Sequence, residues 1–186
     1  MKIGLVADTH IAQEGVQLPP EVFCAFRDVQ LILHAGDIYA LSVLDQLETL
    51  APLVAVRGYP DPRTPDRRLA DGPSLVEIEG VRIGLVHDIN WPGPPIKFDK
   101  RGGLELCGQS LENALMRKFG AIADVVVFGD THEPVIVQHE NKLFVNPGSP
   151  AFPVGRGRDQ GTVGILYVYG GKAWATIAEL QSFSSL

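Results

Sequence analysis

The chain has 186 residues, of which 45% are hydrophobic, and its formal net charge is -6. A chain of this length fits one domain, and a domain of this size buries roughly 70% of the surface that its unfolded chain exposes. The acidic balance argues against general nucleic-acid binding, which needs clustered positive charge. No apolar stretch approaches the roughly 20 residues of a membrane helix, and no basic-then-apolar leader precedes Lys2. We therefore expect a cytoplasmic protein that does not bind membranes.

Short apolar runs bounded by turn residues predict a protein rich in β-strands. In chain order, the predicted strands lie near residues 2–7, 31–35, 53–56, 75–79, 81–86, 124–128, 134–138, 142–146, 162–169 and 173–178. Turn residues at Glu79-Gly80 and at Glu140-Asn141 would join two pairs of these strands as hairpins. Hairpins pair antiparallel, whereas strands separated by helices favour parallel pairing, so we expect mixed sheets.

Three segments show apolar residues at helical spacing. The first covers residues 20–29 and begins with a proline, which suits the first helical turn. The second begins at Ser42, which we expect to act as its N-cap. The third covers residues 109–119 and ends at Gly120.

Two proline-rich stretches fit neither a strand nor a helix. Residues 58–73 and residues 90–103 are predicted as long loops, because each holds several prolines. Loops of this length in a compact domain usually carry a function or are disordered. A further flexible segment, Gly155-Arg156-Gly157-Arg158, offers donors that could meet a phosphate.

Aspartate and histidine gather where four predicted strands end. The tripeptide Asp-Thr-His follows the first strand as Asp8-Thr9-His10 and a later strand as Asp130-Thr131-His132. Two other strands end at Gly36-Asp37 and at His87-Asp88. In an extended segment residues i and i+2 share one side, so we expect each Asp-Thr-His to present both end residues to one site. Six residues from different elements could then converge on a divalent ion: Asp8, His10, Asp37, His87, Asp130 and His132.

Each of these residues also has an ordinary structural interpretation when taken singly. An aspartate that follows a glycine, such as Asp37, is commonly a turn or cap residue. His34 and His139 have no acidic partner at the matching loop position and are interpreted as hydrogen-bonded structural histidines. Asp61 is a loop carboxylate that is expected to approach the site. It is the agreement of four strand ends that favours a metal site.

The order of the motifs resembles that of the calcineurin-like metallophosphoesterases, particularly the small one-domain YfcE-like phosphodiesterases. That family carries Asp-x-His, Gly-Asp, Gly-Asn, a histidine after a strand, Gly-His-x-His and Asn-Pro-Gly-Ser. The corresponding segments in this chain are, in order, Asp8-Thr9-His10, Gly36-Asp37, Gly58-Tyr59, His87, Gly129-Asp130-Thr131-His132 and Asn146-Pro147-Gly148-Ser149. The resemblance implies an α/β (α+β) protein with a four-layer αββα sandwich, in which helices flank two mixed sheets. It implies one domain over residues 1–186, with an inserted, lid-like loop at about 89–107.

The resemblance also assigns the metal ligands. It makes Asp8, His10, Asp37 and His132 ligands of a first ion, and Asp37 a bridge to a second ion that His87 binds. The other two ligand positions of the second ion, an Asn and a His in the family, hold Tyr59 and Asp130 here. Carboxylate in place of imidazole adds hard oxygen, so manganese or magnesium is favoured over zinc, iron or nickel.

The activity implied is hydrolysis of a small phosphoester, with a diester favoured. A pair of divalent ions would generate a bridging hydroxide that attacks phosphorus, with Asp37 in the catalytic centre. Larger relatives place a leaving-group histidine where this chain has Pro60, so Asp61 is the candidate proton donor. Arg156 and Arg158 are the candidate phosphate contacts.

A second interpretation is a binding protein that kept the fold and lost the reaction. One retromer subunit of the superfamily is such an interaction scaffold, and Tyr59 and Asp130 would fit that history. The complete first set of ligands favours the enzyme, because a scaffold has no physical need for it. The oligomeric state is left open between a monomer and a homo-oligomer.

Overall fold

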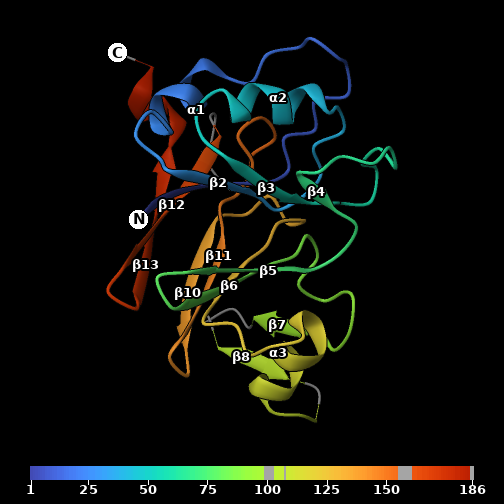
Figure 1. Ribbon diagram of the computed structural model, residues 1–186, viewed down its shortest axis with the longest axis vertical. Coiled ribbons are helices and arrows are strands. Elements are labelled where there is room, and N and C mark those ends of the chain that lie inside the picture. The colour runs from blue at the N-terminus through green and yellow to red at the C-terminus, as the bar shows by residue number, and fades with distance from the viewer. Residues whose placement is uncertain (99–102, 107, 155–160, 185–186) are drawn as a thin grey trace.

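Two mixed β-sheets form the centre of the molecule (Figure 1). The computed structural model describes residues 1–98, 103–106, 108–154 and 161–184. The first sheet has the order β13-β12-β1-β2-β3-β4. Its strands are β1 (Lys2–Val6), β2 (Leu31–His34), β3 (Leu53–Val56), β4 (Leu69–Ala70), β12 (Thr162–Tyr169) and β13 (Lys172–Glu179). The pairs from β1 to β4 are parallel, and β12 is antiparallel to both of its neighbours.

The second sheet has the order β10-β11-β9-β6-β5. Its strands are β5 (Ser74–Ile78), β6 (Val81–Leu85), β9 (Val125–Val127), β10 (Val135–His139) and β11 (Lys142–Asn146). The central strands β6, β9 and β11 run parallel, and the two outer strands pair antiparallel as hairpins. The hairpins predicted at Glu79-Gly80 and at Glu140-Asn141 are therefore confirmed.

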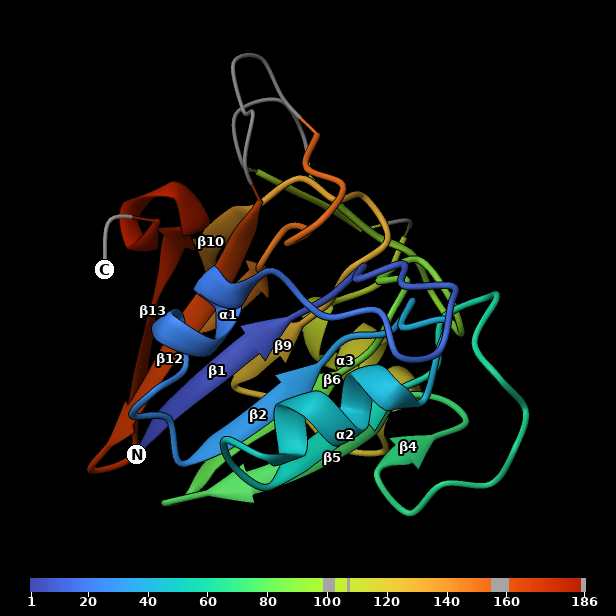
Figure 2. The same ribbon diagram turned by 90° about the horizontal axis from the view of Figure 1, so that it is seen from above.

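Helices cover the two outer faces, which completes the four layers. The helices α1 (Pro20–Ala25) and α2 (Ser42–Glu48) lie across the first sheet (Figure 2). The helix α3 (Leu111–Phe119) lies on the far side of the second sheet (Figure 1), and the short 3-10 helix η1 (Leu180–Phe183) follows β13. Buried apolar residues fill the space between the sheets and both helix-covered faces. The predicted αββα sandwich is confirmed. Among the described residues, no helix has the length and apolar character that crossing a bilayer requires.

Two helix boundaries differ from the sequence predictions. The first helix ends at Ala25 rather than near residue 29, because the chain turns inward to bury Phe26 completely. Gly4 makes room for that ring, since a Cβ there would lie 3.0 Å from it. The second helix has Leu41 as its N-cap, so the predicted capping role of Ser42 is wrong and its buried hydroxyl has no partner. The third helix is capped by Ser110 and ends at Gly120 in a left-handed conformation, as predicted for its end.

The segment predicted as an inserted loop contains a small sheet of its own. Strand β7 (Ile96–Phe98) pairs antiparallel with β8 (Leu104–Leu106). Ile96 is fully buried, and the Phe98 ring stacks on Phe128 with 5.8 Å between centroids. These contacts place β7 against the outer face of the second sheet. The lid-like role of the segment stays a prediction.

Candidate metal centre

The site lies where four parallel strands from the two sheets end. The strands β1 and β2 are parallel neighbours in the first sheet, as are β6 and β9 in the second. Parallel strands deliver their carboxyl ends to one edge of a sheet, and that edge is where α/β proteins bind ligands. The Asp8 N–H donates to the Gly36 carbonyl at 2.9 Å, and the Gly129 N–H donates to the His87 carbonyl at the same distance. The Asp130 N–H donates to Asp8 Oδ1 at 3.1 Å, which joins the loop after β9 of the second sheet to the loop after β1 of the first.

The backbone at this edge is left-handed rather than extended. Positive φ angles of 50° to 72° occur at five candidate residues, namely Asp8, His10, Asp37, Asp130 and His132. We expected the alternation of side chains in an extended strand to bring both end residues of each Asp-Thr-His to one site. That explanation is wrong, because these residues are not in an extended conformation. The loop turns at each end residue, and it is these turns that aim the side chains. A non-glycine residue in this conformation costs roughly 1–3 kcal/mol, and such residues cluster at functional sites.

The first group of potential ligands consists of Asp8, His10 and His132, whose ligand atoms lie within 4.8 Å of one another. The Nε2 atoms of His10 and His132 are 3.0 Å apart, and His132 Nε2 is 3.9 Å from Asp8 Oδ1. His132 Nδ1 lies 2.8 Å from the Phe152 carbonyl, which can only accept a proton, so Nδ1 carries the hydrogen. The lone pair of His132 Nε2 therefore faces the group, as in a histidine that binds a metal.

The second group consists of Asp8, Asp37 and His87 and shares Asp8 with the first. His87 Nδ1 donates to the Ala35 carbonyl at 2.8 Å, so its Nε2 also presents a lone pair. That Nε2 lies 3.1 Å from Asp37 Oδ1 and 3.9 Å from Asp130 Oδ1. The other Asp37 oxygen is 3.4 Å from His10 Nε2, which brings Asp37 within reach of both groups.

The electrostatics of the site favour a cation. Burial raises the pKa of Asp8 to about 6, against an opposing effect of His87 and His132. Burial likewise raises the pKa of Asp37 and lowers the pKa of His10. Asp8 Oδ2 and Asp37 Oδ1 are buried without a hydrogen bond. Asp37 Oδ1 and His87 Nε2 lie 3.1 Å apart, and two acceptor atoms approach this closely without cost when they share a cation or a proton. The donor set thus fits divalent ions.

Glycines allow this close convergence. A Cβ at Gly58 would lie 1.8 Å from Asp37 Oδ1, and a Cβ at Gly36 would lie 2.8 Å from His87 Nδ1. Gly36 also has a φ of 93°, which residues with a side chain rarely adopt. Neither position has room for a side chain while the carboxylate and imidazole keep their places.

Asp61, predicted as a proton donor, supports the backbone of the site. Its side chain accepts hydrogen bonds from the N–H groups of Asp37 at 3.0 Å, Gly58 at 2.8 Å and Tyr39 at 2.9 Å. The residue is only 3% exposed. These contacts give Asp61 a positioning role, and its role as a proton donor stays a prediction.

Three other predicted site residues lie apart from the two groups or outside the described residues. Tyr59 is 74% exposed. Within the described part of the chain, no hydrogen bond or ring contact joins its side chain to the Asp and His residues. Its role as a phenolate ligand stays a prediction. Arg156 and Arg158, the predicted phosphate contacts, lie outside the described residues.

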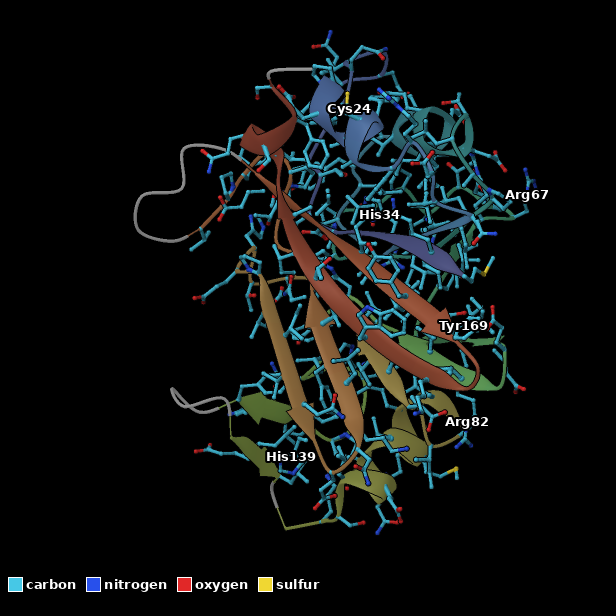
Figure 3. The ribbon with its side chains drawn as sticks, turned by 90° about the vertical axis from the view of Figure 1, so that its left-hand side faces the viewer. Cys24, His34, Arg67, Arg82, His139 and Tyr169 are labelled. Atoms are coloured by element: carbon cyan, nitrogen blue, oxygen red, sulfur yellow. The ribbon has the colours of Figure 1, made fainter. Side chains whose placement is uncertain are left out.

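A buried histidine links the first two loops of the site. Gly36 N–H donates to His34 Nδ1 at 3.1 Å, so the hydrogen of His34 is on Nε2, 3.3 Å from Thr9 Oγ1. Thr9 in turn donates to the Asp37 carbonyl at 3.3 Å. Burial lowers the pKa of His34 to about 3, which keeps it neutral. His34 is thus the hydrogen-bonded structural residue that the sequence predicts, and Figure 3 shows His139 near the opposite end of the molecule.

The Asn-Pro-Gly-Ser segment holds the loops from the second sheet. Asn146 Nδ2 donates to the Gly129 carbonyl at 2.9 Å and to Thr131 Oγ1 at 3.1 Å. Ser149 Oγ donates to the Asp8 carbonyl at 2.7 Å. The segment therefore fixes the backbone of both Asp-Thr-His motifs without contributing a ligand.

Some contributors to the site carry no sequence signal. The carbonyls of Ala35 and Phe152 orient the two histidines, and any residue type would supply the same oxygen. The Tyr39 ring lies 4.7 Å from the His10 ring and limits its orientation. A tyrosine two residues beyond Gly-Asp gives no indication of this contact before the fold is known.

Cavities border both groups of ligands. One, of about 320 Å³, is lined by Gly58 and His87 and so adjoins the second group. The other, of about 560 Å³, is lined by His10 and Phe152 and adjoins the first. A molecule bound at the ions could therefore extend to either side.

Known proteins resemble this chain in sequence and in fold. The family model described as calcineurin-like phosphoesterase superfamily domain matches residues 1–171. The chain is 40% identical over 157 residues to a probable metallophosphoesterase of Methanothermobacter thermautotrophicus, covering 82% of this chain and 79% of that protein. It is 26% identical over 159 residues to a phosphodiesterase of Methanocaldococcus jannaschii, covering 80% and 83%. A zinc complex of Vps29 from Entamoeba histolytica has a similar fold, with a TM-score of 0.65 and 18% identity over 97% and 99% of the two chains.

Proposed function

Because the chain belongs to the calcineurin-like phosphoesterase superfamily, we propose that it is a phosphodiesterase that works with two divalent ions. The observation that carries this proposal is the pair of ligand groups that share Asp8. Each group contains a buried carboxylate oxygen without a hydrogen bond, Oδ2 of Asp8 and Oδ1 of Asp37. Such oxygens are costly in a folded protein unless a cation or a proton satisfies them.

The two ions have overlapping sets of ligands in this proposal. Asp8, His10 and His132 hold the first ion, and Asp37, His87 and Asp130 hold the second. Asp8 belongs to both observed groups, and Asp37 also reaches the first ion through the oxygen that lies near His10. Tyr59 contributes no ligand in this assignment, because its side chain is exposed on the wall of the neighbouring cavity. A water molecule would complete the second set.

The ions, when bound, lower the pKa of a coordinated water and neutralise the charge of the phosphoryl oxygens. The protein's own residues mainly position the reacting groups, since phosphoryl transfer needs little other chemistry from the chain. Asp61 fixes the backbone of Asp37, and the carbonyls of Ala35 and Phe152 orient His87 and His132. Pro60 cannot donate a proton, so we expect faster turnover of diesters whose leaving group needs no protonation.

The two cavities favour a diester over a monoester. A phosphodiester has two organic arms, and the cavities adjoin His87 at one group and His10 at the other. A monoester would fill only one of them. The phosphodiesterase of Methanocaldococcus jannaschii, which is 26% identical to this chain, supports the same assignment.

The composition of the ligand sets favours manganese. The first set has two imidazoles and one carboxylate, which suits several transition metals. The proposed second set has one imidazole, His87, beside the carboxylates of Asp37 and Asp130, and so favours hard cations such as manganese or magnesium. Zinc, iron and nickel remain alternatives for the first site.

A metal-binding or protein-interaction scaffold is the second candidate function. The similarity of fold to Vps29 is compatible with it, although at 18% identity that similarity concerns the fold alone. The substitutions at Tyr59 and Asp130 also fit a centre that binds one ion and has lost catalysis. The two candidates differ in their metal stoichiometry and turnover.

Measurement of bound metal together with hydrolysis of bis(p-nitrophenyl) phosphate tests the proposal. We expect two manganese ions per chain and manganese-dependent release of nitrophenolate. Absence of turnover with manganese, nickel or zinc, together with fewer than one tightly held ion per chain, would overturn it. The double variant Tyr59→Asn, Asp130→His should bind the second ion more tightly. If that affinity did not rise, Asp130 would not lie where the second ion binds.

A further inference from the structure

The cavity of about 320 Å³ beside His87 has two exposed aromatic residues on its wall, Tyr59 and Trp91. Tyr59 is 74% exposed and Trp91 is 63% exposed. Large aromatic side chains gain most from burial, so two of them left open at one cavity next to a reactive centre mark a binding surface. We propose that this cavity receives the nucleoside arm of a phosphodiester substrate, with its base against Trp91 and Tyr59. The proposal rests on the phosphodiesterase function proposed above.

The backbone turn that carries Trp91 is fixed by several hydrogen bonds. The Trp91 backbone N–H donates to the Asp88 carbonyl at 3.0 Å, and the Asn90 backbone N–H donates to Asp88 Oδ1 at 2.7 Å. On its other side, Lys118 of α3 donates to the Pro92 carbonyl at 2.6 Å. Ile89 anchors the same turn in the core with 5% exposure. A surface that is already ordered loses little conformational entropy when a ligand binds to it.

Tyr59 is likewise placed by the site itself. It follows Gly58, whose N–H donates to Asp61 at 2.8 Å. Because Gly58 has no side chain, the Asp37 carboxylate can lie directly against its backbone. The cavity therefore begins where the second ligand group ends. A phosphate held at that group could therefore direct one ester arm into the cavity that Tyr59 and Trp91 line.

The charged groups of the cavity suit a nucleobase better than a plain hydrocarbon. Asp71 and Asp88 line it. Arg57 already binds Asp71 Oδ1 at 2.6 Å and the Asn90 N–H binds Asp88 Oδ1, so the second oxygen of each carboxylate is the one offered to the amino group of a base. Arg63 also lines it, is exposed, and forms no ion pair with any described residue, so its guanidinium is available for stacking or for a ribose or phosphate oxygen. A volume of about 320 Å³ lies within the range of small-molecule sites, roughly 300–1,000 Å³.

Tryptophan fluorescence tests the binding without relying on hydrolysis. The chain has two tryptophans, and the second, Trp174, stacks on Tyr167 in the β12–β13 hairpin with 5.3 Å between centroids. The Trp174→Phe variant therefore reports on Trp91 alone, and Trp91→Phe reports on Trp174 alone. We expect adenosine 5′-monophosphate to quench Trp174→Phe with saturation, with manganese or with chelator present, and to leave Trp91→Phe unchanged. Equal responses of the two variants, or none in Trp174→Phe, would overturn the proposal.

A pair of substrates with one leaving group tests the nucleoside assignment. Thymidine 5′-p-nitrophenyl phosphate and methyl p-nitrophenyl phosphate release the same nitrophenolate and differ only in the second arm. Loss of one base stack lowers affinity by about tenfold. We therefore expect Trp91→Ala to lower kcat/KM for the thymidine substrate about tenfold more than for the methyl substrate, while Trp174→Ala leaves the ratio unchanged.

The outcomes separate this inference from the proposed function. Equal losses for both substrates in Trp91→Ala would assign the cavity to the nitrophenyl arm and overturn the nucleoside assignment while the phosphodiesterase function stood. Failure of the wild-type protein to hydrolyse either substrate, together with fewer than one tightly held ion per chain, would overturn the function, and the fluorescence titration would then decide the binding proposal alone. Trp91 is exposed, so its replacement should leave the melting temperature unchanged, which checks that each variant is folded.

Discussion

The Asp61→Asn variant is expected to melt at a lower temperature and to bind manganese more weakly. Asp61 Oδ2 accepts the N–H groups of Asp37 and Gly58, and Oδ1 accepts that of Tyr39. An asparagine has one acceptor oxygen, so its best orientation keeps the bonds to Asp37 and Gly58. Its amide NH2 then faces the Tyr39 N–H, which loses its acceptor.

The magnitude follows from these three bonds. One partly buried N–H left without an acceptor costs about 1–3 kcal/mol, and each of the two remaining bonds weakens by about 1 kcal/mol when the acceptor loses its charge. The sum is about 3–5 kcal/mol, which corresponds to a fall in melting temperature of roughly 6–20 °C for a domain of this size. Asp61→Ala removes all three acceptors and should cost about 5 kcal/mol. Because the bond to Asp37 positions a metal ligand, we expect manganese affinity to fall at least tenfold in both variants.

Differential scanning calorimetry and manganese titration check these values, with Asp28→Asn as the control. Asp28 is exposed and makes no hydrogen bond to another described residue, so its replacement should change stability by less than about 0.5 kcal/mol. A variant Asp61→Asn with normal stability and normal manganese affinity but lost kcat would refute the reasoning. That result would make Asp61 the proton donor instead.

Three further outcomes are expected. Because the folded-state pKa of Asp8 is raised from 3.8 to about 6, its protonated form stabilises the metal-free protein fully below about 3.8, and this contribution is lost as the pH rises through 6. Melting temperatures without metal should therefore fall over that window, and manganese should raise them more at neutral than at acidic pH; a flat profile would contradict this. Gly58→Ala should lower manganese affinity at least tenfold in calorimetric titration, since its Cβ would lie 1.8 Å from a site carboxylate oxygen, whereas Gly72→Ala, with nothing within 4 Å, should leave it unchanged. His132→Ala should reduce the bound manganese by one ion as measured by metal analysis, and His139→Ala should not; equal loss in both would show that neither is a ligand.

Local patterns were sufficient to predict most of the fold. The runs that form β1, β2, β6 and β9 are short, bounded by turn residues and mostly apolar, which is typical of strands buried on both faces. Both hairpin turns could be predicted because each contains a residue that tolerates the left-handed conformation, Gly80 or Asn141, and both of these have positive φ.

The errors in the fold arise where tertiary packing overrides local preference. The first helix ends early because Phe26 turns into the space above Gly4, a contact between residues 22 positions apart. The strands β7 and β8 escaped prediction because three-residue runs among prolines carry almost no periodicity. Their stability comes from packing, as in the contact of Phe98 with Phe128.

Most members of the two potential ligand groups could be predicted because ligand chemistry depends on residue type. Carboxylates and imidazoles at the ends of separate strands indicate a metal site whatever the detailed geometry, and the motifs kept their order along the chain. The resemblance also identified Tyr59 and Asp130 as the positions where the second site departs from its family.

Geometry within the site could be read only from the tertiary structure. The left-handed turns at Asp8 and Asp37, the carbonyls that set the tautomers of His87 and His132, and the three bonds to Asp61 all involve backbone atoms. Backbone groups are the same in every residue type, so residue identity predicts which atoms can bind a metal but not which are free to do so. That second property depends on how loops from two packed sheets meet, and it is decided when the chain folds.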